Sequence, residues 1–391
     1  MNGAPRRNLD DFHPVTLYSC YMAMNAVAQP VVPEKASNPA VGVKSGFTDL
    51  LKVPFPAEFA EGARNAVTTC LKIQAGEKVT LITDVSCLSI AASMAAELEK
   101  LGCMWTGFVL EDLAPRPLAG MPESVLDDME SSQVSIFAVE VQKNELQSRM
   151  QMTDVVNRRR MRHAHMVNIT PEIMTQGMRA DFNAVDKLSQ AVLDKVRQAT
   201  YIRATTAAGT DIYAQMNPEY RWFKTSGIIS REKWGNLPGG ECFTAPGEVN
   251  GVYVVDGVVG DYLCKEYGLL GKQPLTISIE GNRIAKVSSA NKKLEQDFWN
   301  YTHTDENSDR VGEFAIGTNI GIGRVIGNIL QDEKFPGVHI AFGDPYGAHT
   351  GAKWKSSTHI DVVGLRFNIW LGNAAGEEEQ IMQDGEFLID G

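Results

Sequence analysis

The stretch Lys78-Val-Thr-Leu-Ile-Thr-Asp84 is a short apolar run that ends in an acid, and Leu88–Leu101 follows it with helical spacing and stops at Gly102. The first run predicts a buried strand, and the second predicts a helix that ends at the glycine. The alternation continues downstream through Trp105–Leu110, Pro122–Ser131, Val134–Val141, Asn144–Arg162 and Met166–Ile169. Alternating strands and helices favour βαβ units, and therefore an open parallel sheet with helices on both faces.

A different pattern begins near residue 200, where strand-like runs follow one another. The turn Glu280-Gly-Asn-Arg283 separates two such runs and predicts a hairpin. Helices are predicted at Lys292–Tyr301 and Gly321–Glu333. Strands are predicted at Thr205–Met216, Gly251–Tyr262, Leu275–Val287, Gly337–Phe342, His359–Leu371 and Ile381–Ile389. Antiparallel pairing with inserted helices predicts an α+β domain.

These patterns predict an α/β protein in three parts. Residues 1–55 are rich in proline, which disfavours helices and central strands, so we expect an N-terminal arm. Residues 56–200 are expected to form an open α/β sheet domain. Residues 201–391 are expected to form an α+β domain with a mixed or antiparallel sheet that carries a metal site. No Gly/Ser-rich linker separates the two domains, so we expect them to pack tightly.

Composition limits the classes of function. The chain has 391 residues, of which 43% are hydrophobic and 22% charged, as in ordinary globular proteins. Its formal net charge of −11 repels phosphate backbones, so nucleic-acid binding is not expected. No run of about 18 apolar residues predicts a membrane span. The acidic start does not resemble a signal peptide and the six cysteines form no CxxC pair, so we expect a cytoplasmic protein with reduced thiols.

The sharpest chemical feature is His359-Ile-Asp361. Residues two apart on a strand point to the same face, so an imidazole and a carboxylate project side by side. Such a pair can bind a metal ion, or the aspartate can orient the histidine. An exposed polar pair at the start of a strand is the alternative interpretation.

Three more candidates lie in the same half of the chain. His339 stands in the apolar run Gly337–Gly343, ahead of a glycine-rich loop; a histidine satisfied within the core is the alternative. Glu241 and Glu313 stand among apolar neighbours and follow glycines. A buried carboxylate must be paired, hydrogen-bonded or bound to metal, so a salt bridge is the alternative for both.

Together these candidates make a set of mixed nitrogen and oxygen donors: Glu241, Glu313, His339, His359 and Asp361. Such a set suits Zn, Mn, Co or Fe(II) and differs from a thiolate site. Five ligands exceed the needs of one catalytic metal with an open position. They suit two metal ions that share a bridging carboxylate, as in metal-assisted hydrolysis.

Two other motifs are weaker. Gly321-Ile-Gly323-Arg-Val-Ile-Gly327 has GxGxxxG spacing and not the GxGxxG spacing of dinucleotide-binding loops. The basic run Arg158–His165 contains His163 and His165, and it favours a solvated helix face or an anion contact over a metal site.

Five motifs in order give the chain a resemblance to the aminopeptidase T family of dinuclear metallopeptidases. They are Asn236–Pro246, Arg310–Glu313, Val338–Gly343, His359–Asp361 and Asp384–Ile389. The resemblance covers about residues 200–391, and the N-terminal half is similar in layout only. It implies a metal-dependent hydrolase that cleaves a peptide or small amide bond.

The resemblance also implies roles for residues. The five candidate ligands would hold two divalent ions, Zn, Co or Mn, which polarise a carbonyl and supply hydroxide. Glu313 would move the proton, and Tyr346, seven residues after His339, would donate to the oxyanion. The loop after His339 departs from the family pattern, so we expect His349, Lys353 and Trp354 to line the substrate pocket.

The last third of the chain also resembles the ring-cleaving dioxygenases of the 2,5-dihydroxypyridine type, which share the His-x-Asp strand. That resemblance implies, as the alternative function, a mononuclear Fe(II) extradiol-type dioxygenase. Its second histidine falls where this chain has Glu313, and Glu241 and His339 lack counterparts, which favours the hydrolase. A non-catalytic scaffold is a third possibility, disfavoured by the intact ligand set. We expect a peptide or small-molecule substrate and a homodimer, with no membrane partner.

Overall fold

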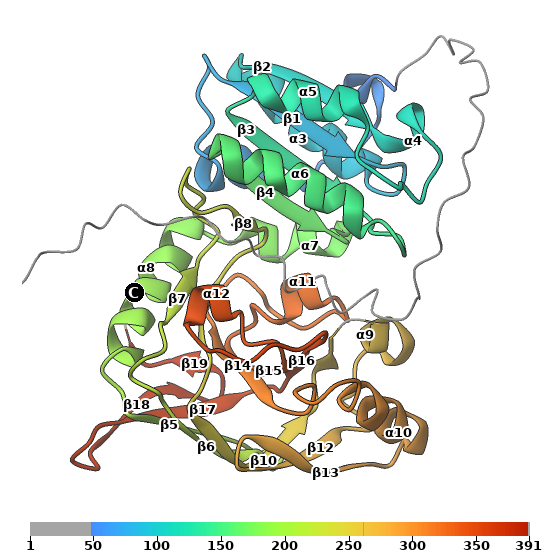
Figure 1. Cartoon of the computed structure of the whole chain (residues 1–391). Helices are drawn as coiled ribbons and strands as arrows, with labels where there is room; N and C mark the ends of the chain where they lie inside the picture. The colour runs from blue at the N-terminus through green and yellow to red at the C-terminus, as the bar shows by residue number, and fades with distance from the viewer. Residues whose placement is uncertain (1–47, 261, 390–391) are drawn as a thin grey trace, which may run out of the picture.

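The computed structural model describes residues 48–260 and 262–389, so most of the predicted arm at 1–55 lies outside the described residues. The chain builds three β-sheets. One parallel sheet is flanked by helices, and two antiparallel sheets form a second body below it in Figure 1. This arrangement confirms the predicted α/β fold, with a parallel sheet first and antiparallel sheets afterwards. No helix among the described residues has the length and apolar character needed to cross a membrane.

The parallel sheet, sheet A, contains three strands close to those predicted from the alternating pattern, and a fourth that begins at Arg162, four residues before the strand predicted at Met166–Ile169. Its strand order is β2-β1-β3-β4-β8. The strands are β1 (Lys78–Thr83), β2 (Met104–Val109), β3 (Val134–Val139), β4 (Arg162–Val167) and β8 (Gly235–Asn236). Around them lie η2 (Leu50–Lys52), α2 (Phe59–Arg64), η3 (Asn65–Cys70), α3 (Leu88–Leu101), α4 (Leu110–Leu113), α5 (Glu123–Ser131), α6 (Leu146–Arg159), α7 (Pro171–Thr175), η4 (Gly177–Arg179) and α8 (Phe182–Val196). Strand β8 comes from beyond residue 200, so the second half of the chain completes the first sheet.

Two predicted helices are wrong in extent. The helix predicted at Asn144–Arg162 ends earlier, because Arg160 adopts a left-handed backbone with φ of 51° and the chain then enters β4. The helix predicted at Gly321–Glu333 is reduced to α11 (Ile329–Asp332). The carboxylate of Asp332 accepts hydrogen bonds from three preceding backbone amides, at Ile326, Gly327 and Asn328, and so stabilises a loop there.

The second body contains two antiparallel sheets. Sheet B has the order β13-β12-β10-β6-β5-β17-β18-β19, and sheet C has the order β11-β16-β15-β14-β9-β7. The strands of sheet B are β5 (Tyr201–Thr206), β6 (Asp211–Gln215), β10 (Glu248–Val255), β12 (Leu275–Glu280), β13 (Arg283–Ser289), β17 (Phe367–Gly372), β18 (Glu378–Gln383) and β19 (Glu386–Phe387). Those of sheet C are β7 (Phe223–Thr225), β9 (Glu241–Thr244), β11 (Val258–Val259), β14 (Val311–Gly317), β15 (Gly337–Gly343) and β16 (His359–Val363). The helices are α9 (Tyr262–Tyr267), α10 (Lys292–Tyr301) and α12 (Gly347–Thr350).

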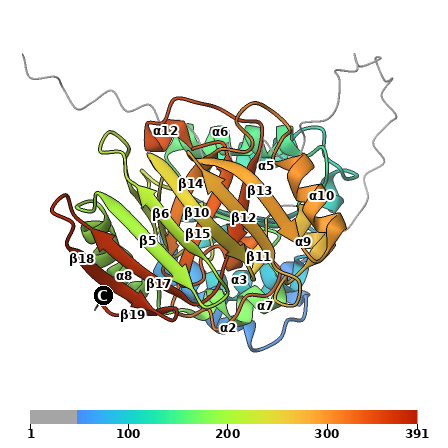
Figure 2. The same cartoon turned by 90° about the horizontal axis from the view of Figure 1, so that it is seen from below.

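Sheet C lies between sheet B and the parallel-sheet unit (Figures 1 and 2). One of its faces packs on sheet B in the largest hydrophobic core, to which Phe314, Ile340 and Val362 belong. The buried Tyr253 on β10 crosses this core, and its hydroxyl donates to the carbonyl of Val338 at 2.7 Å. The same oxygen lies 3.1 Å from the carbonyl of Val362 and accepts the amide of Gly364 at 2.9 Å. One side chain therefore ties β10 to β15 and β16.

We predict that Tyr253→Phe lowers the free energy of unfolding by about 1–3 kcal/mol, because it leaves buried backbone groups without a partner. Denaturant unfolding followed by circular dichroism measures the change. The matched control is Tyr213→Phe on β6, whose side chain is 41% exposed and should change stability by less than about 0.5 kcal/mol. Equal effects from the two substitutions would contradict the cross-sheet role of Tyr253.

Candidate metal centre

Strand register brings the candidate ligands to one face of sheet C. Across the antiparallel ladder, Glu313 pairs with Ala341 and Ala341 pairs with Asp361. His339 on β15 and His359 on β16 lie two residues from these positions, so their side chains share that face. Glu241 begins β9 and pairs with Gly317 of β14. Four adjacent strands therefore supply five ligand-type side chains to one surface.

Small residues leave room between the candidate ligands. Ala315 and Ala341 occupy the positions beside them on the same face, and Gly317 lies opposite Glu241. The residue before Glu241 is also constrained, since Gly240 has φ of 132° and a Cβ there would lie 2.6 Å from the Cβ of Asn319. A larger side chain at Gly240 would displace the start of β9, which explains the glycine ahead of this carboxylate.

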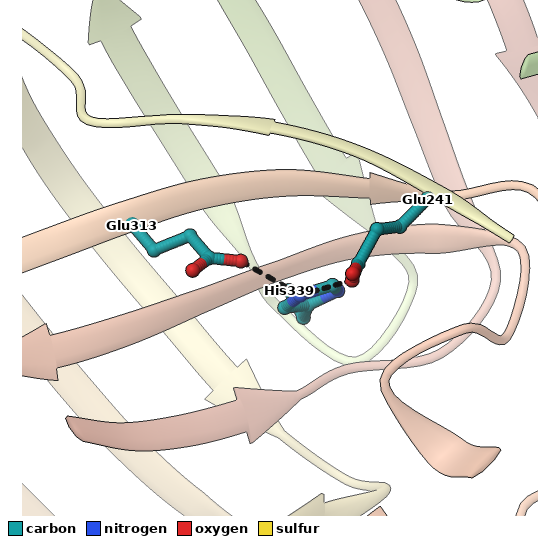
Figure 3. A group of neighbouring side chains, drawn as sticks. All are labelled: Glu241, Glu313 and His339. Atoms are coloured by element: carbon teal, nitrogen blue, oxygen red, sulfur yellow. Dashed lines mark ion pairs between the residues drawn. The ribbon is translucent and has the colours of Figure 1, made fainter. Parts of the chain in front are cut away.

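The candidate ligands form two groups that share Glu313. In the first, which we call the Glu241 position, His339 Nε2 lies 3.5 Å from Glu241 Oε2 and 3.5 Å from Glu313 Oε1 (Figure 3). In the second, which we call the Asp361 position, His359 Nε2 lies 3.5 Å from Glu313 Oε2 and 3.6 Å from Asp361 Oδ1. The two oxygens of Glu313 thus face different groups, as a bridging carboxylate would.

The donor atoms fit divalent metal ions. His339 Nε2 and Glu313 Oε2 are buried and have no hydrogen-bond partner within the described parts of the chain. Such orphaned atoms are rare in folded proteins, and a bound ion would satisfy them. His359 Nδ1 donates to the carbonyl of Asp344 at 2.9 Å, which leaves Nε2 directed at the carboxylates. Metal-binding histidines are oriented by this kind of second hydrogen bond.

Burial and mutual charge shift the pKa values in the centre. Burial raises the pKa of Glu313 above its usual value. Burial opposes protonation of His359, but the charge of Asp361 outweighs it and raises the pKa of His359 to about 10. The metal-free centre therefore holds a proton on this imidazole at neutral pH.

Two charged residues of the centre were not predicted from the sequence. Lys334 Nζ lies 2.6 Å from Glu241 Oε1 and 2.5 Å from Glu333 Oε1, and all three side chains are buried. Burial raises the pKa of Glu333 to about 8, although Lys334 opposes that shift. No local sequence signal identified them, because two adjacent charged residues ahead of a strand are typical of an exposed loop.

A cavity opens over this face of sheet C and has walls from both halves of the chain. Glu313, His359 and Tyr346 line it from the antiparallel body, and His165 and Trp234 line it from the side of sheet A. The Tyr346 ring lies with its centroid 4.3 Å from that of His359. The candidate centre therefore faces the junction of the two halves.

The remaining predicted residues lie elsewhere. None of the three loop residues His349, Lys353 and Trp354 lines this cavity. His349 packs edge-on against Phe223, Lys353 is exposed, and the indole of Trp354 donates to the carbonyl of Gly343 at 3.1 Å. Their role in substrate binding stays a prediction.

The helix-face interpretation of Arg158–His165 is wrong for its two histidines. His163 and His165 are buried on β4, where His163 bridges Ser135 Oγ at 2.8 Å and His165 Nδ1 at 3.0 Å. Burial lowers the pKa of His163 to about 3 and that of His165 well below its usual value. Both imidazoles are therefore neutral, and neither belongs to the two ligand groups.

Comparison with known protein families identifies the family of this chain. The sequence matches the thermophilic metalloprotease (M29) family over residues 178–387. This match spans more than half of the chain, which therefore belongs to that family of metallopeptidases. A comparison with curated protein sequences found no match.

Two solved structures share the fold. Wild-type AmpT from Thermus thermophilus is similar with a TM-score of 0.61 and 17% identity, covering 85% of this chain and 99% of that one. The 2,5-dihydroxypyridine dioxygenase from Pseudomonas putida KT2440 is similar with a TM-score of 0.61 and 13% identity, covering 84% and 96%. At these identities the structures establish the fold, and the family match distinguishes the metallopeptidase.

We predict that metal binding releases protons and tightens as pH rises. The pKa of His359 is about 10 in the metal-free centre, so below pH 10 a metal ion must displace its proton. Apparent affinity should rise by up to about tenfold per pH unit between pH 6.5 and 9. Calorimetry in buffers of different ionisation enthalpy measures the protons released. Pure proton uptake, or an affinity that falls with pH across this range, would contradict a protonated His359 in the metal-free protein.

Proposed function

We propose that this protein is a dinuclear metal-dependent hydrolase of the aminopeptidase T type, which cleaves a peptide or small amide bond. The observation that carries the proposal is the sharing of Glu313 between two ligand groups on one face of sheet C. Two divalent ions, Zn, Co or Mn, would be held by Glu241, Glu313 and His339 on one side and by Glu313, His359 and Asp361 on the other. Membership of a metallopeptidase family supports the reaction class.

Metal ions bound there supply Lewis acidity, which polarises a substrate carbonyl and makes water nucleophilic at neutral pH. The protein residues do the rest. Glu313 accepts a proton from the attacking water and passes it to the leaving amine. Tyr346 lines the same cavity and donates a hydrogen bond to the carbonyl oxygen as that oxygen gains negative charge.

The position of the cavity supports a substrate that reaches the metal centre between the two halves of the chain. His165, Trp234 and Asn236 on the sheet A side face Glu241 and Tyr346 on the sheet C side. A peptide end held here has its scissile carbonyl beside the ligands, while side chains of sheet A close the opposite wall. Enclosure of this kind excludes water and strengthens the polar contacts made to the substrate.

We predict that Tyr346→Phe lowers kcat by about 100- to 1,000-fold without changing the metal content, because one donor to the developing oxyanion is lost. Glu313→Gln should lower both kcat and metal content, because that residue is both ligand and proton carrier. Steady-state kinetics and elemental analysis of the same samples separate the two effects. Tyr213→Phe is the control, since Tyr213 is exposed on β6 outside the cavity and should leave both quantities unchanged.

The experiment that tests the proposed function combines metal removal with paired substrates. Protein purified without chelator should contain two equivalents of Zn, Co or Mn and cleave peptides with a free amino terminus. Acetylation of that terminus should abolish cleavage if the enzyme is an aminopeptidase, and chelation should abolish it reversibly. One equivalent of iron, with oxygen consumed in the presence of a dihydroxypyridine, would contradict the hydrolase and favour the dioxygenase.

A further inference from the structure

The centre contains one permanent positive charge that the proposed reaction does not use. The side chain of Lys334 is 3% exposed, and its ammonium group contacts Glu241 and Glu333. A lysine held between two carboxylates is charged at neutral pH, and both contacts here are direct. A buried ammonium group in contact with a candidate metal ligand competes with any cation for the same oxygens.

Lys334 donates a hydrogen bond to only one of the two carboxylate oxygens of Glu241. Glu241 Oε1 accepts hydrogen bonds from Lys334 Nζ at 2.6 Å and from the Thr225 hydroxyl at 2.8 Å. Glu241 Oε2 faces His339 Nε2 at 3.5 Å. Glu241 can therefore offer only Oε2 to a metal ion while this arrangement holds, and that ion would lie close to the ammonium charge.

The Asp361 position has a different environment. Within the described ranges, neither Asp361 nor Glu313 forms an ion pair with a lysine or arginine, and their ionic partners are the imidazoles. No ammonium group contacts either oxygen of Asp361, although Lys334 is near enough for its charge to act on this carboxylate. The two positions share Glu313. They differ in their other carboxylate, because Lys334 contacts Glu241 whereas His359 contacts Asp361.

We propose that Lys334 makes the two metal positions unequal, so that the Asp361 position fills first and the Glu241 position binds its ion more weakly. The inference rests on the proposed two-metal centre. Repulsion between the ammonium group and the ion acts most strongly at the Glu241 position, because Lys334 contacts that carboxylate directly. At low metal concentration, most protein molecules then hold a single ion at the Asp361 position. The Glu241 position fills only as the metal concentration rises.

Metal titration of the apoprotein tests this proposal without an activity assay. Equilibrium dialysis or calorimetry with Zn²⁺ and Co²⁺ should resolve two binding steps, the second weaker by about tenfold or more. Lys334→Met should strengthen the second step by about 10- to 100-fold, the size seen when groups around metal ligands are changed. The first step should change by less than about threefold.

Ligand variants identify which step belongs to which position. His359→Ala should remove the tight step, and His339→Ala should remove the weak one. Lys224→Met is the matched control, because Lys224 pairs with Asp186 outside the cavity and should alter neither step. The double variant Glu333→Gln/Lys334→Met removes the buried lysine together with its carboxyl partner and provides a second test if the single variant is unstable. It should also strengthen the weak step.

Two outcomes overturn the proposal while leaving the hydrolase intact. One is a wild-type protein that binds two ions with equal affinity. The other is a ratio of affinities that does not change in Lys334→Met or in the double variant. Failure of the wild-type protein to bind any of these ions would overturn the proposed function as well, and so the two failures are distinguishable.

Discussion

Antiparallel pairing of β14, β15 and β16 is the constraint on which the rest of the structure depends. The register sets Glu313, Ala341 and Asp361 side by side, and the two-residue period of the strands adds His339 and His359 to the same face. A slip of one residue would turn these groups into the hydrophobic core and expose its apolar side chains. The core between sheets B and C therefore protects the register that builds the candidate metal centre.

Charge balance is the second constraint. Glu241, Glu313, Glu333 and Asp361 are all buried within one cavity, and burial of unpaired carboxylates is costly. In the metal-free chain Lys334 and a proton on His359 offset part of this charge, and burial raises the pKa of Glu313 and Glu333 and so favours their neutral forms. Metal ions would replace the proton, whereas the ammonium group stays in place. The buried carboxylates attract a metal ion, whereas the ammonium group of Lys334 repels it. Opposing interactions of this kind are more typical of functional sites than of stabilising cores.

Sequence patterns predicted much of this arrangement for identifiable reasons. His359 and Asp361 could be placed on one face because strand periodicity is local, and Glu241, Glu313 and His339 stood out as polar residues in apolar runs. Lys334 and the closure of sheet A by Gly235–Asn236 could not be predicted, because both depend on contacts between segments far apart in the chain. Most of the helix predicted at Gly321–Glu333 does not form, because backbone amides of the loop donate hydrogen bonds to the carboxylate of Asp332. Hydrophobic periodicity gives no information about such hydrogen bonds.

Anomalous diffraction from crystals of metal-loaded protein, recorded at the absorption edge of the bound metal, tests the shared role of Glu313 most directly. We expect two peaks on the face of sheet C, with Glu313 between them and with one oxygen of Glu241 at the peak beside His339. A peak away from the five candidate ligands, or a single peak that does not contact Glu313, would contradict a dinuclear centre bridged by this carboxylate.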